Sequence, residues 1–209
     1  MNSIYEKQNL EKFIKLLAAQ RYLYNKAKKI KANRTYFSLF LIIASLAASI
    51  WYNKWSPYLS ILAGIWTFAL LLFKNYEKTI IVRAAKIQEE FDTTLFQLPW
   101  NNLLVGSKIT REIITDANLN FKGDRSRLQN WYANYNKDSD IQNVILCQRA
   151  NLSWDWRLRE AYCSFIMLLI IILFFGEAIY ALVEQKSFYG YLVELFIPSI
   201  PIIGMGIES

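Results

Sequence analysis

The sequence predicts an all-α integral membrane protein with four transmembrane helices and a cytoplasmic helical bundle between helices 2 and 3. Hydrophobic residues make up 54% of the chain. They gather into four blocks, each roughly 16 to 22 residues long, close to the ~20 residues that a helix needs to cross a bilayer. No segment shows the sustained apolar and polar alternation that predicts a strand. The blocks are 36–51, 57–73, 162–183 and 188–207.

A soluble all-α protein with buried helices is the alternative, but four blocks without an internal Lys or Arg are unusual for such helices. Topology follows from charge, because Lys and Arg are concentrated in 1–34, whereas the turns 53–56 and 184–187 hold one Lys each. The positive-inside rule then predicts a cytoplasmic N-terminus and external short turns. The predicted regions are a cytoplasmic amphipathic helix (1–34), a transmembrane hairpin (35–73), a cytoplasmic stalk and sensor region (74–160) and a second transmembrane hairpin (161–209).

Helical periodicity predicts two long helices that continue the first two spans. The N-terminal one carries an apolar stripe of Leu10, Phe13, Ile14, Leu17, Tyr24 and Ala27. The other leaves the second span with a stripe of Ile80, Ala84, Ile87, Phe91, Leu95 and Leu98. Pro99 has no amide hydrogen and biases Leu98 away from α geometry, so we expect this helix to end there.

Three further helices are predicted in the cytoplasmic region. Ser107 can cap the first, which carries Ile109, Ile113, Ile114 and Ala117 and ends at the break 118–123. Asp124 can cap the second, with Leu128, Trp131, Tyr132 and Tyr135 on one face. Ser139 or Asp140 can open the third, with Ile141, Val144, Ile145, Gln148 and Leu152 leading towards the third span.

The composition argues against an enzyme. The chain has no His, which excludes His-based catalytic triads and the usual zinc sites. Glu89, Glu90 and Asp92 form only a weak candidate for a metal site, because such acids on a helix of mixed charge are usually solvated. We therefore predict no metal and no cofactor.

Cys147 and Cys163 are expected on different sides of an interface in a reducing compartment, without a disulfide. The basic N-terminal helix near anionic headgroups explains most of the net charge of +7, so no DNA or RNA partner is expected.

Two strings, "LAAQRYLYNKAKK" (17–29) and "AAKIQEEFDTTLFQLPWN" (84–101), together with the order of spans and cytoplasmic segment, resemble the SMODS-associating four-transmembrane effector family. The resemblance covers nearly the whole chain. It implies a pore-forming effector of bacterial anti-phage (CBASS) signalling in the inner membrane. Such an effector is expected to sense a cyclic di- or oligonucleotide, assemble with copies of itself and kill the infected cell.

The residues that carry the second string have two possible roles. They can form a binding pocket, or they can form the hinge at which the stalk packs against the cytoplasmic bundle. A hinge would connect sensing to the second span. The residues are Gln88, Glu89, Phe91, Asp92, Leu98, Pro99, Trp100 and Asn101.

A cyclic oligonucleotide requires donors for its phosphates and flat side chains for its bases. The region 108–135 supplies both kinds, although its aromatic residues also have the spacing of an ordinary buried helix face and basic residues are expected on any cytoplasmic segment. The candidate ligand-binding residues are Lys108, Arg111, Arg125, Arg127, Trp131 and Tyr132.

Glu177 and Glu194 lie at similar distances from the turn near Lys186, so we expect them at similar depth in the last two spans. In an assembly around an axis they can form an acidic ring that favours cations. The alternative is that one or both are protonated and hydrogen-bonded within the hairpin, or reach the headgroups. For the whole protein, the alternative to a pore is a non-conducting membrane scaffold that recruits a cytoplasmic partner.

Overall fold

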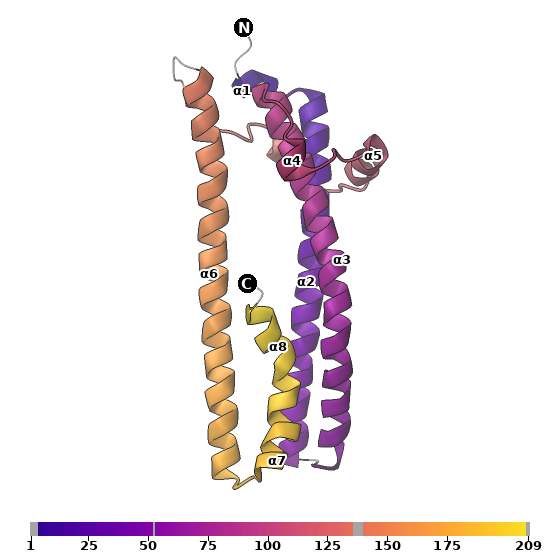
Figure 1. The fold of residues 1–209 in the computed structure, drawn as a ribbon, viewed down its shortest axis with the longest axis vertical. Helices are drawn as coiled ribbons and strands as arrows, with labels where there is room; N and C mark the ends of the chain where they lie inside the picture. Colours follow the sequence, from indigo (N-terminus) through magenta and orange to yellow (C-terminus); the bar gives the residue numbers. More distant parts are fainter. Residues whose placement is uncertain (1–3, 52, 136–139, 208–209) are drawn as a thin grey trace. The chain divides into compact units, whose positions relative to one another are not determined.

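The protein is described by a computed structural model covering residues 4–51, 53–135 and 140–207. All regular elements in these ranges are helical (Figure 1). They are α1 (Ile4–Lys7), α2 (Glu11–Trp51), the 3₁₀ turn η1 (Asn53–Trp55), α3 (Ser56–Phe96), α4 (Asn102–Val105), α5 (Arg111–Leu119), the 3₁₀ turn η2 (Arg125–Leu128), α6 (Asp140–Val183), α7 (Phe188–Tyr191), the π-helical turn η3 (Leu192–Phe196) and α8 (Ile197–Ile207).

The chain divides into two compact units, and the three long helices contribute to both. The first unit comprises Met1–Lys29 and Tyr76–Ser153. Its core confirms most of both predicted stripes: Phe13 and Leu17 of α2 are buried, as are Ile80, Ala84, Ile87, Phe91 and Leu95 of α3. The predicted end residues Leu10 and Leu98 are exposed. The ring of Phe91 meets the edge of Phe13, with centroids 5.6 Å apart.

The predicted end of α3 is confirmed by its backbone. The helix stops at Phe96, and Gln97 then adopts a positive φ of 58°. The amide of Leu98 donates to the carbonyl of Thr93 at 2.9 Å. The positive φ of Gln97 and this hydrogen bond together close the last turn of α3 just before Pro99, which cannot continue the helix.

Two predictions for the helices of the region 107–135 were wrong. Thr110, not Ser107, occupies the N-cap position of α5. After the turn η2, which Asp124 caps through the amide of Ser126, the chain is not helical at Trp131 and Tyr132. The physical reason is tertiary: the side chain of Gln8 accepts from the Tyr132 amide at 2.8 Å and donates to its carbonyl at 3.1 Å, so these backbone groups need no helical partner.

The predicted helix α6 begins at Asp140, while the alternative start at Ser139 lies outside the described residues. Ile141, Ile145 and Leu152, which were named for this helix, are exposed. The side of α6 that faces the core carries Cys147, which is buried. Both cysteines are free, in agreement with the sequence.

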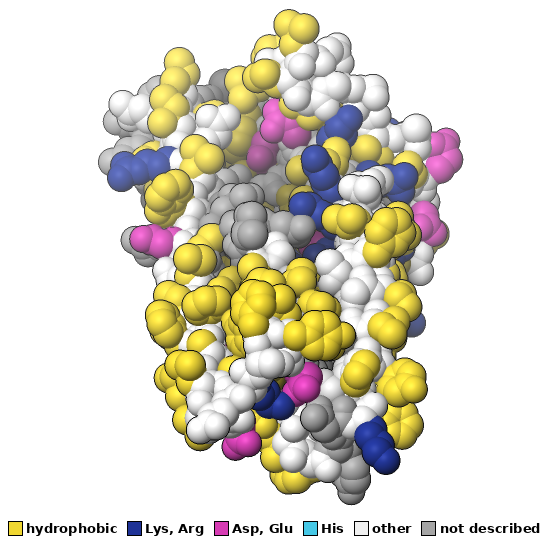
Figure 2. Space-filling model, turned by 60° about the horizontal axis from the view of Figure 1, so that its bottom comes forward, with side chains coloured by type: hydrophobic (Ala, Val, Ile, Leu, Met, Phe, Trp, Pro, Cys, Tyr) yellow, Lys and Arg dark blue, Asp and Glu magenta, His cyan; other side chains and the backbone are white. Residues whose placement is uncertain are grey.

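The second unit comprises Ile30–Asn75 and Trp154–Ser209. Its small buried cluster contains Ile42 and Ile202, with Leu39, Leu46, Leu169, Ile170 and Leu173 packed around it. Hydrophobic side chains cover much of its surface, as Figure 2 shows. In the described residues, three helices are long and apolar enough to cross a membrane, within Glu11–Trp51, Ser56–Phe96 and Glu160–Val183, and a shorter apolar helix covers Phe188–Gly204.

The last of these helices contains a π-helical turn, η3, which ends at Phe196, two residues before Pro198. Pro198 has no N–H to donate to the carbonyl of Glu194, and the amide of Ile197 donates to the carbonyl of Leu192 rather than to that of Val193. The hydroxyl of Ser45 on α2 donates to the Glu194 carbonyl at 2.7 Å, and the hydroxyl of Ser60 on α3 donates to the Val193 carbonyl. Serines of the first hairpin thus satisfy backbone groups that would be costly to leave unpaired in lipid.

Candidate ligand-binding site

The first unit contains a groove that combines positive charge with apolar walls. Helix α2 supplies Lys12 and Lys15, and Arg111 begins helix α5. The groove has a volume of about 460 Å³, which is within the usual range for small-molecule sites. We call this the basic groove; its lining residues are Lys12, Phe13, Lys15, Leu16, Glu90, Thr94, Arg111, Ile114, Thr115, Asn118 and Leu119.

An ion pair holds α5 against α3 at one wall of the basic groove. Arg111 Nη2 lies 3.1 Å from Glu90 Oε1, and the Glu90 side chain is only 4% exposed whereas that of Arg111 is 76% exposed. Because the guanidinium has more donors than one carboxylate oxygen can use, it can serve an anion in the groove as well.

The two lysines of the basic groove are presented differently. Lys15 pairs with Glu11 at 2.7 Å on the surface of α2, and this hydrogen bond lowers the pKa of the Glu11 carboxyl. The ammonium of Lys12 lies 4.8 Å from the ring centroid of Phe13. Three cations face one carboxylate among the lining residues, so the groove favours an anionic ligand.

The N-terminus of α5 does not supply a further anion site. Glu112, in the first turn of α5, bonds to its own backbone amide and to Thr110, and these bonds lower the pKa of its carboxyl. Its charge already complements the positive end of the helix dipole. Anion binding in the basic groove must therefore depend on side chains.

The structure does not bring the six predicted ligand residues together. Arg111 lines the basic groove, and Arg125 lies at its edge, where it donates to the side chain of Asn118 at 3.0 Å. The other four residues are elsewhere. Lys108 is 5.2 Å from the Trp100 ring, Arg127 is 3.8 Å from Asp124, Trp131 is 5.8 Å from Arg21, and Tyr132 is in the core.

A second groove lies between α3 and α6 and has the opposite charge. It has a volume of about 380 Å³ and contains the carboxylates of Glu89 and Asp92 but, among its described lining residues, no Lys or Arg. We call it the acidic groove. Its lining residues are Ala85, Gln88, Glu89, Asp92, Thr93, Leu98, Gln148, Asn151 and Leu152.

A partly buried hydrogen-bond network forms one end of the acidic groove. The hydroxyl of Tyr132 donates to Asp92 Oδ1 at 2.6 Å and accepts from Asn151 Nδ2 at 2.6 Å. Burial raises the pKa of Asp92 to about 7 against the opposing effect of this bond, and Glu89 raises it further. Burial also raises the pKa of the Tyr132 phenol. The charge of this groove consequently changes near neutral pH.

Comparison with known proteins identifies the family of this chain. The family model of the SMODS-associating 4TM effector domain matches residues 2–209. The chain belongs to this family. It is also 34% identical over 211 residues to a protein of Bacillus cereus (strain VD146) described as a "Probable CBASS effector molecule", covering 98% of this chain and 71% of that protein. No solved structure matches. The predicted all-α membrane fold is thereby confirmed, and the protein is a multi-pass membrane protein.

The residues on which the family resemblance was based serve several structural purposes. Phe91 packs in the core, while Gln88, Glu89, Asp92 and Leu98 line the acidic groove. Gln88 also accepts from Gln20 on α2 at 2.8 Å, which links the two characteristic strings of this family member.

The final part of the string, Pro99 to Asn101, forms a turn. Trp100 Nε1 donates to the carbonyl of Gly106 at 2.8 Å, and Asn101 Oδ1 caps α4 by accepting from the amides of Leu103 and Leu104, each at 3.1 Å. Whether this turn acts as a hinge stays a prediction, as does the role of the acidic groove in ligand binding.

The two carboxylates predicted for a pore differ in their surroundings. Glu177 is 3% exposed. Glu194 forms an ion pair with Lys186 and accepts from the hydroxyl of Ser49 at 2.8 Å. In a single chain the charge of Glu194 is thus balanced, and the acidic ring stays a prediction about an assembly.

Sequence reasoning missed Lys12 and Lys15 as site residues. Both belong to the basic N-terminal helix, where charge toward lipid headgroups is an adequate explanation. A signal was present in their spacing, because residues three apart on a helix point in similar directions. Only the fold, which sets α5 opposite them, distinguishes these two lysines from the others of α2.

Proposed function

We propose that the protein is a membrane effector of anti-phage defence that binds a cyclic oligonucleotide in the basic groove, oligomerises and permeabilises the inner membrane. Family membership supports the coarser part of this proposal, a membrane effector of anti-phage defence. The relative from Bacillus cereus is itself described as a CBASS effector. The binding site, the assembly and the pore are our inference.

The observation that carries the proposal is the charge of the basic groove. Lys12, Lys15 and Arg111 converge on it from two helices, and each can donate to a phosphate oxygen. Thr94, Thr115 and Asn118 add neutral donors and acceptors beside them. The aliphatic side chains of Ile114 and Leu119 offer surfaces on which a nucleobase can lie.

The basic groove shares helix α3 with the predicted second span. Its wall includes Glu90 and Thr94 of α3, and α3 continues without interruption to Ser56. A ligand that draws α2 and α5 together across this helix would bias its position. Four spans from one copy enclose little space, so a pore requires several copies. We expect the change in the position of α3 to favour their assembly.

Dye release from liposomes tests the proposal. The purified full chain is reconstituted and treated with cyclic di-, tri- and tetranucleotides at micromolar concentration. We expect release with one member of the panel. Folded and inserted protein that releases no dye with any member would reject ligand-gated permeabilisation and support the alternative of a non-conducting scaffold.

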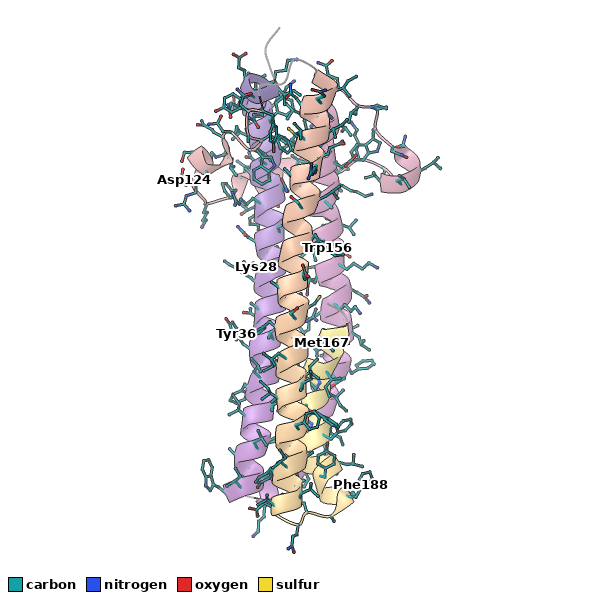
Figure 3. The ribbon with its side chains drawn as sticks, turned by 90° about the vertical axis from the view of Figure 1, so that its left-hand side faces the viewer. Lys28, Tyr36, Asp124, Trp156, Met167 and Phe188 are labelled. Carbon is teal, nitrogen blue, oxygen red and sulfur yellow. The ribbon has the colours of Figure 1, made fainter. Side chains whose placement is uncertain are left out.

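Neutralising two lysines locates the binding site. Lys12→Gln with Lys15→Gln is expected to weaken binding of the active nucleotide at least tenfold, since two charge-assisted hydrogen bonds are lost. Lys28→Gln with Lys29→Gln is the matched control: it makes the same change in net charge on the same helix, at exposed positions outside the groove (Lys28, Figure 3). Equal loss in both double variants would assign the effect to long-range charge rather than to the groove.

The predicted acidic ring belongs to the permeabilising step. In an assembled pore, Glu177→Gln with Glu194→Gln is expected to reduce cation preference without preventing assembly. The pairing of Glu194 with Lys186 implies that Glu194 contributes to such a ring only if this ion pair opens. Unchanged ion selectivity in the double variant would count against the ring.

A further inference from the structure

The turn after α3 displays two leucines almost completely to solvent. Leu103 is 97% exposed and Leu104 is 85% exposed, and both lie on the four-residue helix α4. Single exposed hydrophobic residues are ordinary on protein surfaces, whereas a contiguous exposed patch is a candidate interaction site. We call this pair the leucine knob.

The knob is held in place by specific bonds rather than by packing. Asn101 Oδ1 caps the two leucine amides, Trp100 Nε1 anchors the carbonyl of Gly106, and Gly106 adopts a φ of 74° that favours glycine. Lys86 fixes the following residue by donating to the Ser107 carbonyl at 3.1 Å. A rigid knob loses little conformational entropy when it binds.

The surroundings of the knob are basic. The ammonium of Lys86 reaches the carbonyl of Ser107, and that of Lys108 lies over the Trp100 ring. A surface that receives the knob should therefore combine an apolar floor with negative charge. Lipid is an unsuitable occupant, because α3 runs on for about 23 residues, roughly 35 Å, after the apolar block ends at Phe73.

The acidic groove of the same chain has the required properties. It places Glu89 and Asp92 beside the aliphatic side chains of Leu98 and Leu152. An apolar cavity of roughly 150 Å³ can hold benzene, so a groove of about 380 Å³ has room for two leucine side chains. Leu98 lies five residues before Leu103, so the knob and the groove are both at the end of α3 where α4 follows.

We propose that the leucine knob of one copy docks in the acidic groove of a second copy. Each copy carries both halves of the contact, so two copies can exchange knobs around a twofold axis. Lys108 of one copy would then approach Glu89 of the other. The inference deepens the assembly step of the proposed function by naming the surface through which cytoplasmic units pair.

Photocrosslinking of the full chain in liposomes tests this contact directly. A benzophenone amino acid in place of Leu104 is expected to give a covalent dimer, with the crosslink mapped to the acidic groove of the other copy. The control places the same probe at Ile141. This residue is 72% exposed on α6 and is not among the lining residues of the groove. Crosslinks only within one chain, to another surface of the second copy, or to a different protein would overturn the proposal.

Substitutions test whether the contact stabilises the pair. Leu103→Ser with Leu104→Ser should lower the dimer fraction at least tenfold by mass photometry in nanodiscs, whereas Ile141→Ser should not. Lys108→Glu and Glu89→Lys should each weaken the dimer, and the two together should restore it. A dimer that is insensitive to the serine pair, or a charge exchange without rescue, would overturn the contact.

The same variants separate this inference from the proposed function. Ligand-triggered dye release with an unaltered dimer in the serine variant would reject the knob and leave the effector function standing. A knob-dependent dimer in a chain that releases no dye with any cyclic nucleotide would reject the effector function and leave the contact standing.

Discussion

Two grooves use the same helix, α3, and have opposite charge. Glu90 lines the basic groove and its neighbour Glu89 lines the acidic one, because successive residues on a helix point about 100° apart. The difference comes from the helices that complete each groove: α2 and α5 bring Lys12, Lys15 and Arg111, whereas α6 brings amides and a leucine. Residues of the string 84–101 thus contribute to two surfaces. One surface is suited to an anion and the other to a cationic or amide-rich partner.

Reversing the charge of the basic groove should have the largest effect on this difference. With Lys12→Glu and Lys15→Glu the groove holds more carboxylates than cations, so we expect the cyclic nucleotide to bind at least about 100-fold more weakly, as expected for two lost charge-assisted bonds plus repulsion. Isothermal titration calorimetry on the detergent-solubilised chain measures this change.

The matched change in the other groove is Glu89→Gln, which removes a negative charge from the opposite side of α3. It should leave nucleotide affinity within about twofold, because Glu89 does not line the basic groove. If Glu89→Gln altered nucleotide binding as strongly as the lysine reversals, the two grooves would not be functionally distinct.

The partly buried carboxyl of Asp92 gives the acidic groove a pH dependence. Its pKa of about 7 in the folded chain exceeds the ~3.9 of an unfolded Asp. The folded state therefore binds more protons between these values, and stability falls as the pH rises from about 4 through about 7.

Asp92→Asn should remove this loss of folding stability at high pH. We expect stabilisation on the order of 2 kcal/mol at pH 8, shrinking as the pH is lowered to 5, with Tyr132 still able to donate to the amide oxygen. Apparent melting temperatures of both chains in detergent, measured from pH 5 to 8, check the prediction. Parallel pH profiles would contradict it.

Gly106→Ala perturbs the leucine knob while leaving the lining of both grooves intact. A φ of 74° is unfavourable for alanine, and the added Cβ would lie 3.3 Å from Lys86 Nζ. A cost of about 1 to 3 kcal/mol is expected, because a φ of 74° with a ψ of −161° lies in a backbone region that is essentially restricted to glycine. Hydrogen exchange should increase at the amides of residues 102–106 only; increased exchange throughout α3 would show that the turn supports the whole unit.

The sequence predicted the parts of the fold that depend on local pattern. The stripes of α2 and α3 and the stop at Pro99 follow from periodicity and from proline chemistry, and the structure agrees at Phe13, Phe91 and Leu95. The segment around Tyr132 could not be predicted in this way. Its backbone is satisfied by Gln8, 124 residues away, and no local propensity reports such a partner.

The candidate site shows the same limit. Arg111 was predicted from its neighbourhood in the sequence, whereas Lys12 and Lys15 belong to a helix about 100 residues earlier. Side-chain charge alone does not reveal which lysines of a basic helix face another helix and which face solvent. Phe13 packs α2 against Phe91 of α3, and Arg111 of α5 pairs with Glu90 of the same helix. These contacts join elements that were each predicted but could not be paired from sequence.

Glu90→Gln should have a small effect on nucleotide affinity, and it tests the balance of charge within the basic groove itself. Glu90 is the only carboxylate among the described residues that line the basic groove, and it pairs with Arg111. Replacing it removes a competitor for the guanidinium, so we expect the nucleotide to bind about threefold more tightly, since such pairs with an exposed partner are worth up to about 1 kcal/mol. The gain should diminish as salt is added. Weaker binding instead would mean that Glu90 holds Arg111 in its binding position, and that the negative charge on this side of α3 serves the anion site rather than opposing it.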